Sequence, residues 1–258
     1  MYCSIIGHPL KNPRSIPIWK SYFKKKKLKI KMKGIDVLPK KFDKLILSLK
    51  KDKNFFASAV TMPYKKSIFK HADILDDSAK LSKSINLIIK KKNKIKGFNT
   101  DVYGAYETVK KIKKDKIIIY GYGGAGSAIC NYFSKKYKKS KIIVISSKKR
   151  KLKTKNVKLK KKIDSVDLCQ TNLFINASPL GSNLKKNYIS RTPIDQNELK
   201  KMKKNSTIFD IVYKPKKNRL SKLCKKNRIK YFNGLKMNTL QAQKALQILS
   251  DNIFNIKG

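Results

Sequence analysis

The sequence predicts an α/β protein of two domains, and three observations carry that prediction. Short apolar runs alternate with longer amphipathic segments along most of the chain. Strands that alternate with helices form parallel sheets connected by crossover helices. The length of 258 residues suits one large or two small domains. The apolar share of 40% is enough for a real core.

The first hundred residues contain a complete set of elements. Apolar runs predict strands at 2–7, 32–38 and 55–60, followed by a pair at 85–89 and 94–98 across a polar turn. A helix is expected at 16–23 and another at 42–49. In the second helix, apolar residues follow the helical spacing: Phe42, Leu45, Ile46 and Leu49. This part of the chain is therefore expected to form one α/β unit.

A second α/β unit is expected after Asp101. Helices are predicted at 102–112 and 127–136, and strands at 116–120, 141–145, 173–176 and 207–212. The last helix is expected at 239–254. The lysine runs at 24–27 and 160–162 are interpreted as solvated faces or loops.

The charge of the chain is extreme. Lys and Arg number 65 against 15 acids, which gives a formal net charge of +50. Such an excess is typical of nucleic-acid binders. Only five of the 65 are Arg, however, and the lysines are spread along the whole chain. Nucleic-acid proteins favour Arg for bidentate contacts, so we interpret the charge as compositional bias and expect no specific nucleic-acid partner.

The cysteines and the longest apolar runs bear on the compartment. Four cysteines lie far apart and form no CxxC pair: Cys3, Cys130, Cys169 and Cys224. They fit neither a zinc site nor a disulfide scaffold, so we expect reduced thiols, no metal and a cytoplasmic protein. Apolar stretches of about five residues predict no membrane span, and no signal peptide is expected.

A glycine-rich segment follows the strand expected at 116–120. Residues 121–126 satisfy GxGxxG, with a strand before and a helix after, as dinucleotide binding requires. Gly121 permits the tight turn, Gly123 lets backbone N–H groups approach a pyrophosphate, and Ala125 or Gly126 allows close helix–strand packing. Gly124 completes the turn, and the helix N-terminus adds partial positive charge. This segment predicts a dinucleotide site.

The end of the next strand indicates which dinucleotide is bound. An acid there would bind the ribose diol of NAD. The chain has instead a polar and basic stretch: Ser146, Ser147, Lys148, Lys149, Arg150 and Lys151. A basic stretch attracts a 2′-phosphate, so NADP is the expected cofactor.

Several motifs resemble the shikimate dehydrogenase family from end to end. The chain has Gly7-His8-Pro9 with Ser15, then Val60-Thr61-Met62-Pro63-Tyr64-Lys65, Ile85-Asn86 and Asn99-Thr100-Asp101 with Gly104. After the glycine-rich turn come Asn176-Ala177-Ser178-Pro179-Leu180-Gly181, Asp210 with Tyr213 and Pro215, and Gly234-Leu235 with Met237 and Gln241. The motifs occur in the family's order and at similar spacing.

This resemblance implies a fold and an activity. A substrate-binding domain would comprise residues 1–101, completed by the C-terminal helix at 238–258, and a Rossmann-like NADP domain would comprise residues 102–237, with the active site in the cleft between them. Dehydroshikimate would be reduced at its ketone to shikimate. The reduced ketone oxygen needs a proton, which Lys65 would deliver, held by Asp101.

The resemblance also implies the other site residues, one by one. Substrate hydroxyls and carboxylate would be bound by Ser15, Thr61, Asn86, Tyr213 and Gln241. The cofactor would contact Gly121, Gly123, Gly124, Ala125, Gly126, Ser146, Ser147, Lys148, Lys151, Asn176, Ser178, Ile211 and Gly234. No metal site is implied, and a monomer and a homodimer are equally compatible with the sequence.

One departure from the family pattern affects substrate choice. The family has two serines, two apart, for the substrate carboxylate, and here Pro13 replaces the first. In an extended segment Lys11, Pro13 and Ser15 would share one face, so Lys11 is expected to offset the missing hydroxyl. A paralogue acting on quinate or another polyol acid with NAD or NADP stays open, as does a catalytically silent nucleic-acid-binding or regulatory protein on the same fold.

Overall fold

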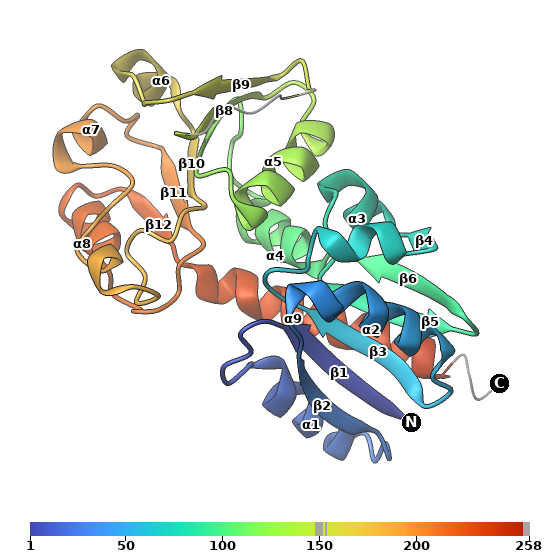
Figure 1. Cartoon of the computed structure of the whole chain (residues 1–258). Helices are drawn as coiled ribbons and strands as arrows, with labels where there is room; N and C mark the ends of the chain where they lie inside the picture. Colours follow the sequence, from blue (N-terminus) through green and yellow to red (C-terminus); the bar gives the residue numbers. More distant parts are fainter. Residues whose placement is uncertain (148–151, 153, 255–258) are drawn as a thin grey trace. The chain divides into compact units, whose positions relative to one another are not determined.

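The computed structural model describes residues 1–147, 152 and 154–254. It has two compact units (Figure 1). The first contains Met1–Tyr103 together with the residues from Gln241 onward, and the second contains Gly104–Leu240. The α/β class predicted from the sequence is confirmed in both units.

The first unit is built on a mixed sheet in the order β2-β1-β3-β5-β6-β4. Its strands are β1 (Tyr2–Gly7), β2 (Lys31–Asp36), β3 (Phe55–Val60), β4 (Ile74–Leu75), β5 (Leu87–Lys91) and β6 (Lys94–Phe98). Strand β1 is parallel to β2 and β3, whereas β5 is antiparallel to β3 and β6. The carboxyl ends of β1 and β3 therefore lie at the same edge, where the turn that carries Lys65 begins.

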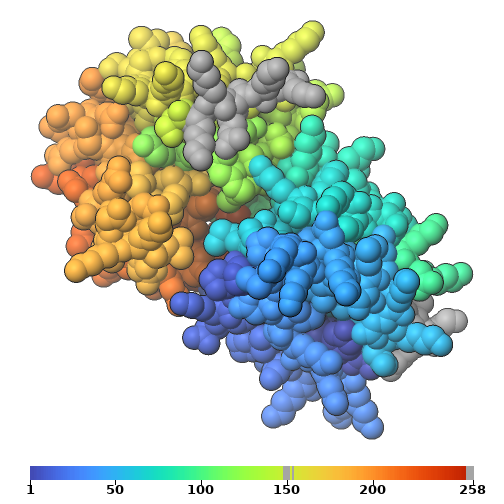
Figure 2. Space-filling view, viewed as in Figure 1, coloured from blue at the N-terminus to red at the C-terminus, as the bar shows by residue number. Residues whose placement is uncertain are grey.

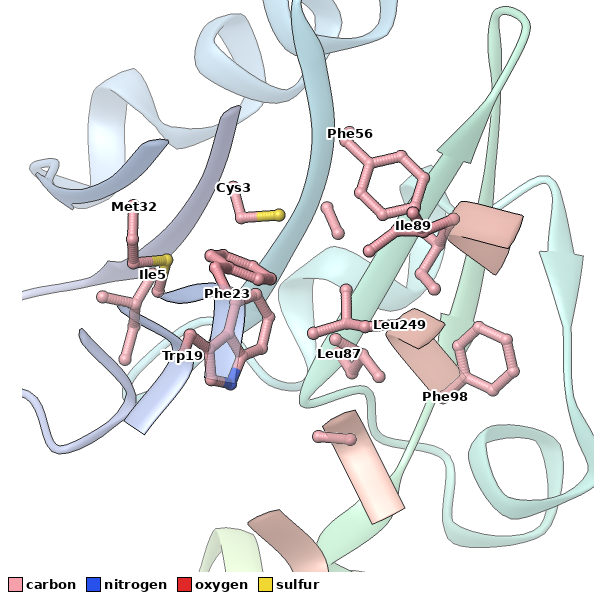
Figure 3. Close-up of a cluster of buried hydrophobic side chains, with 13 residues drawn as sticks. Cys3, Ile5, Trp19, Phe23, Met32, Phe56, Leu87, Ile89, Phe98 and Leu249 are labelled. Carbon is pink, nitrogen blue, oxygen red and sulfur yellow. The ribbon is translucent and has the colours of Figure 1, made fainter. Parts of the chain in front are cut away.

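Helices cover both faces of the first sheet. They are α1 (Ser15–Lys25), α2 (Pro39–Lys51), the 3-10 turn η1 (Ser67–His71) and α3 (Asp77–Ser82). One face packs against α1 and the end of the chain's last helix, α9 (Gly234–Phe254), as Trp19, Leu87 and Leu249 show in Figure 3. The other face packs against α2, through residues such as Phe42 and Ile46. In β5, for example, Leu87 and Ile89 belong to the first cluster and Ile88 to the second, as the pleat requires.

The second unit is built on a fully parallel sheet in the order β12-β11-β10-β7-β8-β9. Its strands are β7 (Lys116–Tyr120), β8 (Lys141–Ile145), β9 (Val157–Lys160), β10 (Leu173–Asn176), β11 (Thr207–Asp210) and β12 (Lys230–Phe232). This is the strand order of the Rossmann fold. The order reverses between β7 and β10, so the carboxyl ends of these two strands form the topological switch point where such sheets bind ligands.

The helices of the second unit lie on both faces of its sheet. They are α5 (Gly124–Lys136), α6 (Ser165–Gln170), the 3-10 turn η2 (Lys186–Tyr188), α7 (Gln196–Lys200) and α8 (Arg219–Lys226). Residues of α6, α7 and α8 share one apolar cluster with Ile118 and Phe174. Helix α5, whose buried residues are outside that cluster, contacts β7 and β8. Helices α4 (Thr100–Val109) and α9 each begin in one unit and end in the other.

The lysine-rich segments differ from one another in their surroundings. Lysines 24–27, at the end of α1, are exposed, and long side chains of the α1–β2 region (blue) extend from the surface in Figure 2. The interpretation of 160–162 as a solvated segment is wrong for Lys160. It ends β9 and forms ion pairs with Asp164 and Asp167, and Asp167 also pairs with Lys116 at 2.7 Å. The buried carboxylate of Asp167 therefore keeps the side chains of Lys116 and Lys160 largely buried.

Candidate active site

Lys65 and Asp101 form an ion pair in the first unit. Lys65 lies in the turn after β3, and Asp101 lies in the first turn of α4. The Nζ of Lys65 donates to the Oδ2 of Asp101 over 2.5 Å. The two side chains are 31% and 25% exposed, so a ligand can reach both. An ammonium bonded to one carboxylate retains two N–H donors for another partner, which suits this group to proton transfer.

The backbone around Lys65 is fixed by its neighbours. The ring of Tyr64 is buried and stacks on Phe42 with 4.1 Å between centroids, and its hydroxyl donates to the carbonyl of Val37. The carbonyl of Lys65 itself accepts from the N–H of Ile85 at 2.8 Å. The backbone of Lys65 is therefore held in place, and only its side chain can move. A fixed backbone of this kind suits a group that must be positioned reproducibly.

Asp101 is held at the start of α4. The buried side chain of Asn99 accepts from the N–H of Val102 at 3.2 Å and donates to the carbonyl of Ser84 at 2.9 Å. Asn99 therefore caps the helix and ties it to the loop before β5. Asp101 stands in the first turn of this capped helix, so its backbone position is fixed by Asn99.

Asn86 and Gln241 meet at Thr100. The side-chain Nδ2 of Asn86 donates to the Thr100 hydroxyl at 3.0 Å, and its Oδ1 accepts from the Thr100 N–H at 2.8 Å. The same hydroxyl donates to the Oε1 of Gln241 at 3.1 Å. This role of Thr100 was not predicted from the sequence, although the residue lies inside the motif that ends at Asp101. Two predicted substrate residues are thus connected by a residue adjacent to the ion pair.

Thr61 and Ser15 are also in the first unit. Thr61 follows β3 and is half-buried, and its backbone N–H donates to the carbonyl of Ile6 at 2.9 Å. Ser15 is the first residue of α1 and is half-buried. Within the described part of the chain, neither hydroxyl is bonded to the Lys65–Asp101 pair. Nor does either hydroxyl form another hydrogen bond within those described residues, so both can bind another group.

The segment before Ser15 corrects one expectation. Asn12 has a φ of 43°, and Arg14 has helical angles of −61° and −24°. The chain is bent here, so the alternation of an extended segment does not apply. The expectation that Lys11, Pro13 and Ser15 share one face was wrong, because the turn into α1 begins before Ser15.

The glycine-rich turn of the second unit leaves open space where a ligand would lie. Gly121 has a φ of +99°, and a Cβ on Gly126 would lie 2.0 Å from the carbonyl oxygen of Gly121. A Cβ on Gly123 or Gly124 would meet nothing within 4 Å. Ala125 is exposed beside them at the start of α5. Close packing on one side and open backbone at a helix N-terminus on the other fit a pyrophosphate group.

Asn176 and Ser178 lie at the carboxyl end of β10, across the switch point from Gly121. A Cβ on Gly121 would be 3.0 Å from the backbone nitrogen of Ser178. The Asn176 amide donates to Leu180 and Asp210 and accepts from the N–H and the hydroxyl of Ser178. These four bonds use the full capacity of a side-chain amide. Asn176 therefore shapes the loop, and a direct bond from its side chain to a cofactor would displace one of these contacts.

Asp210 at the end of β11 completes this network. It is fully buried and accepts from Asn176 at 2.9 Å, from the N–H of Val212 at 3.0 Å, from Asn218 at 2.8 Å and from Tyr231 at 2.9 Å. All four donors are neutral. Burial raises the pKa of Asp210 despite these bonds. One carboxylate thus holds together the ends of β10, β11 and β12.

The remaining predicted residues of the second unit lie beside this network. Ile211 and Gly234 are neighbours, because a Cβ on Gly234 would be 2.0 Å from the carbonyl oxygen of Ile211. The backbone N–H of Gly234 donates to the carbonyl of Val212 at 3.1 Å. The start of α9 therefore requires glycine. Tyr213 lies in the loop after β11 and is half-buried.

The chain is similar to known proteins over nearly its whole length. A family model for the shikimate dehydrogenase substrate binding domain matches residues 5–88. A shikimate dehydrogenase (NADP(+)) of Clostridium botulinum is 31% identical over 268 residues, which is 98% of this chain and 97% of that protein. The chain belongs to the shikimate dehydrogenase family. The resemblance drawn from the motifs is thereby confirmed.

Other members of the shikimate dehydrogenase family agree with this assignment. A shikimate dehydrogenase (NADP(+)) of Methanocaldococcus jannaschii is 31% identical, over 95% of this chain and 89% of that protein. A solved shikimate dehydrogenase in complex with NADP+ superposes with a TM-score of 0.80 at 27% identity, over 97% of this chain and 90% of the other.

Of the four residues after β8 that are expected to determine the choice between NADP and NAD, the structure describes two. Ser146 and Ser147 directly follow β8, and the backbone N–H of Ser146 donates to the Lys160 carbonyl at 3.0 Å. Lys148 and Lys151 lie outside the described residues. Their contact with a 2′-phosphate stays a prediction.

Neither a metal-binding cluster nor a membrane-spanning helix is found among the described residues. No group of three or more His, Cys, Asp or Glu side chains is placed to hold a metal ion in residues 1–147, 152 and 154–254. Over the same residues, no helix has both the length and the apolar character needed to cross a membrane.

Proposed function

We propose that this chain catalyses the reversible, NADP-dependent reduction of 3-dehydroshikimate to shikimate, a step of chorismate and aromatic amino-acid biosynthesis. The observation that carries the proposal is the Lys65–Asp101 pair, present in a chain that aligns with shikimate dehydrogenases over nearly its full length. The first unit would bind the substrate and the second unit the cofactor.

NADP would be held at the switch point of the second sheet. The open backbone of Gly123 and Gly124 would receive the pyrophosphate, and Ser146 and Ser147 lie at the strand end that reads the 2′ position. The loop shaped by Asn176 lies next to the same turn. When bound, the cofactor supplies or accepts the hydride at the substrate carbon.

Lys65 would move the proton. As the ketone carbon is reduced, negative charge develops on its oxygen, and the Nζ of Lys65 donates a proton to that oxygen. In the reverse direction the neutral amine takes the proton from the hydroxyl. Asp101 keeps the ammonium in place and balances its charge, and it can accept a hydrogen bond from a neighbouring hydroxyl of the substrate.

The other polar groups of the first unit would orient the substrate. Thr61 and Ser15 have hydroxyls without a partner in the described residues, and Gln241 has an amide nitrogen that its bond to Thr100 leaves available. Asn86 is 8% exposed and already engaged with Thr100, so its contribution is chiefly to fix that group. Tyr213 in the second unit stays a prediction.

A second candidate follows from Pro13. Proline offers no hydroxyl and no backbone N–H, so the carboxylate of shikimate would lose one donor relative to the family pattern. A quinate-type paralogue using NAD or NADP is therefore the alternative. A catalytically silent nucleic-acid-binding or regulatory protein is disfavoured, because the Lys65–Asp101 pair is intact.

One assay tests the proposal and its alternative together. Reduced nicotinamide is followed by absorbance with shikimate or quinate, each with NADP or NAD. We expect the highest kcat/KM with shikimate and NADP. A higher value with quinate would favour the paralogue, and no turnover with any pair would refute both enzymes.

Further proposals concern the surroundings of the protein. The described cysteines form no disulfide, and burial raises the pKa of the Cys3, Cys130 and Cys224 thiols to about 12. Such thiols stay protonated, in keeping with the proposed cytoplasmic location.

We expect a monomer or homodimer, to be determined by light scattering. Binding to duplex DNA should be weak, non-specific and lost steeply with salt.

A further inference from the structure

The second unit has a cationic cavity at the edge of its sheet opposite to the glycine-rich turn. Its volume is about 350 Å³, and its lining includes Lys111, Lys113, Lys204, Arg228 and Lys230. Lys111 and Lys113 precede β7, Lys204 precedes β11, Arg228 precedes β12, and Lys230 begins β12. Because the sheet is parallel, the amino ends of these strands share one edge. The cavity is therefore separate from the carboxyl edge, where the proposed NADP site lies.

The charges around this cavity are poorly compensated. Lys113 pairs with Asp115 at 2.9 Å, and Lys230 lies over the ring of Phe232 at 5.5 Å. The side chains of Lys111, Lys204 and Arg228 have no bonded or ion-pair partner in the described part of the chain, and no acid is among the described residues that line the cavity. Like charges that surround one cavity repel one another, so an anion placed among them relieves that repulsion.

Arg228 distinguishes this cavity from the lysine-rich surface in general. It is one of five arginines among 65 basic residues. A guanidinium presents a planar fork that bonds two phosphate oxygens at once, which an ammonium does not. Arg228 also adopts a φ of 53°, a conformation that favours glycine or asparagine at the end of a helix. The chain therefore keeps an arginine here in a backbone position that does not favour it.

The lining also limits the class of anion. Ile112 is the one apolar residue among the described residues that line the cavity, and no aromatic ring is among them. A nucleobase or a lipid chain would find no surface to pack on. The uncharged polar residues Asn205, Ser206 and Thr207 complete the lining beside the cations. The lining fits a compact ligand that is charged throughout.

We propose that this cavity binds a compact oligophosphate, with Arg228 bonding two of its oxygens and Lys111, Lys204 and Lys230 neutralising the rest. The site is independent of the proposed reaction, because none of these residues belongs to the predicted active site.

Calorimetric titration with inorganic tripolyphosphate at about 0.15 M salt tests the proposal. One variant carries Lys111→Gln, Lys204→Gln, Arg228→Gln and Lys230→Gln. The matched control carries Lys40→Gln, Lys41→Gln, Lys44→Gln and Lys51→Gln, which removes the same charge from exposed positions on α2. The glycine-rich turn is unchanged in both, so any phosphate bound there cancels in the comparison.

We expect saturable binding of one tripolyphosphate, weakened about tenfold or more in the cavity variant and less than about twofold in the control. Arg228→Lys, which keeps the charge but loses the fork, should weaken binding by about two- to fivefold. Equal losses in the two quadruple variants, or no saturable binding to the wild-type protein, would overturn the proposal. Thermal unfolding of the cavity variant should show no loss of stability and NADP affinity should be unchanged, which excludes misfolding as the cause.

Discussion

Each unit has an aspartate at its candidate site: Asp101 in the first unit and Asp210 in the second. The two side chains differ in their exposure to solvent and in their hydrogen-bond partners. Asp101 is 25% exposed and faces a cation that can exchange a proton. Asp210 is fully buried and faces four neutral donors. A carboxylate that takes part in chemistry needs access and an adjustable partner, whereas a carboxylate that holds loops needs every lone pair satisfied. Exposure and partner type thus distinguish Asp101, which we propose takes part in the reaction, from Asp210, which positions loops.

The largest effect that tests this comparison is expected at Lys65. Replacing Lys65→Ala removes the proposed proton donor, so kcat should fall by about 10² or more, the usual scale for a general acid. The midpoint of thermal unfolding should change little, because the side chain is half-buried and its partner Asp101 remains hydrated. Steady-state kinetics and calorimetry measure the two quantities. Near-normal turnover would place Lys65 among the positioning groups and break the comparison.

Asp210→Asn should show the opposite profile. The new amide nitrogen would face donors where a carboxylate oxygen accepted two bonds, which costs about 1–3 kcal/mol of unfolding free energy. The melting temperature should fall by about 2–10 °C, and kcat at saturating substrates should change far less than in Lys65→Ala.

Asp195→Asn is the control for that variant. It removes one exposed carboxylate from a helix cap, where asparagine serves equally well. Its melting temperature should stay within about 1–2 °C of the wild type. If Asp210→Asn and Asp195→Asn have the same melting temperature, the buried network around Asp210 contributes no more to stability than an exposed helix cap does.

A pair of glycine variants sharpens the comparison within the second unit. Gly124→Ala adds a methyl group to open space at the start of α5, so stability should be kept while NADP affinity falls about tenfold. Gly126→Ala drives its methyl group against the Gly121 carbonyl, so the fold itself should lose about 1–3 kcal/mol. Fluorescence titration and thermal melts distinguish them. Loss of stability in Gly124→Ala would mean that the space is not open.

The smallest expected effect is a pH dependence. Burial raises the folded-state pKa of Asp210 above its usual value of 3.8, so the folded protein binds this proton more readily than the unfolded chain. Stability from this group therefore increases as pH falls through its folded-state pKa and levels off below about 3.8. The stability difference between the wild type and Asp210→Asn should grow in that window. Urea unfolding at a series of pH values measures it, and a constant difference would contradict the assignment.

Other carboxylates change stability in the opposite direction. A bond from Lys160 lowers the pKa of Asp164 to about 2, with a further contribution from the Asp167 N–H. The stabilisation from such a group is present above its usual pKa and is lost as pH falls. The comparison with Asp210→Asn isolates Asp210, because these groups are common to both proteins.

The long apolar elements and the motif residues could be predicted from the sequence, whereas the short polar elements could not. Strands such as 116–120 and 173–176 have the bounds the apolar runs predict. Strand β9 and helices α6 and α7 were missed, because each has only four to six residues, of which at most three are apolar, and so shows no clear periodicity. For α7 a signal was available, since Asp195 and Glu198 have the spacing of a capping box.

The candidate site shows the same limit. Lys65 and Asp101 could be paired from their motifs, and the structure places them in contact. The role of Thr100 and the saturation of Asn176 depend on which groups face each other after folding, and no local pattern encodes that. The bend at Asn12 was missed for a similar reason, because a positive φ at asparagine depends on its surroundings.

Helix α9 has a consequence for the order in which the protein is made. Its first turns belong to the second unit, while Ala245, Leu249 and Ile253 fill the apolar cluster around Trp19 and Phe23 of the first. On the ribosome, the first hundred residues emerge early but lack one wall of their core until residue 253 has been added. The nascent first unit therefore exposes aromatic surface throughout synthesis of the second, a period in which it is open to chaperones and to aggregation.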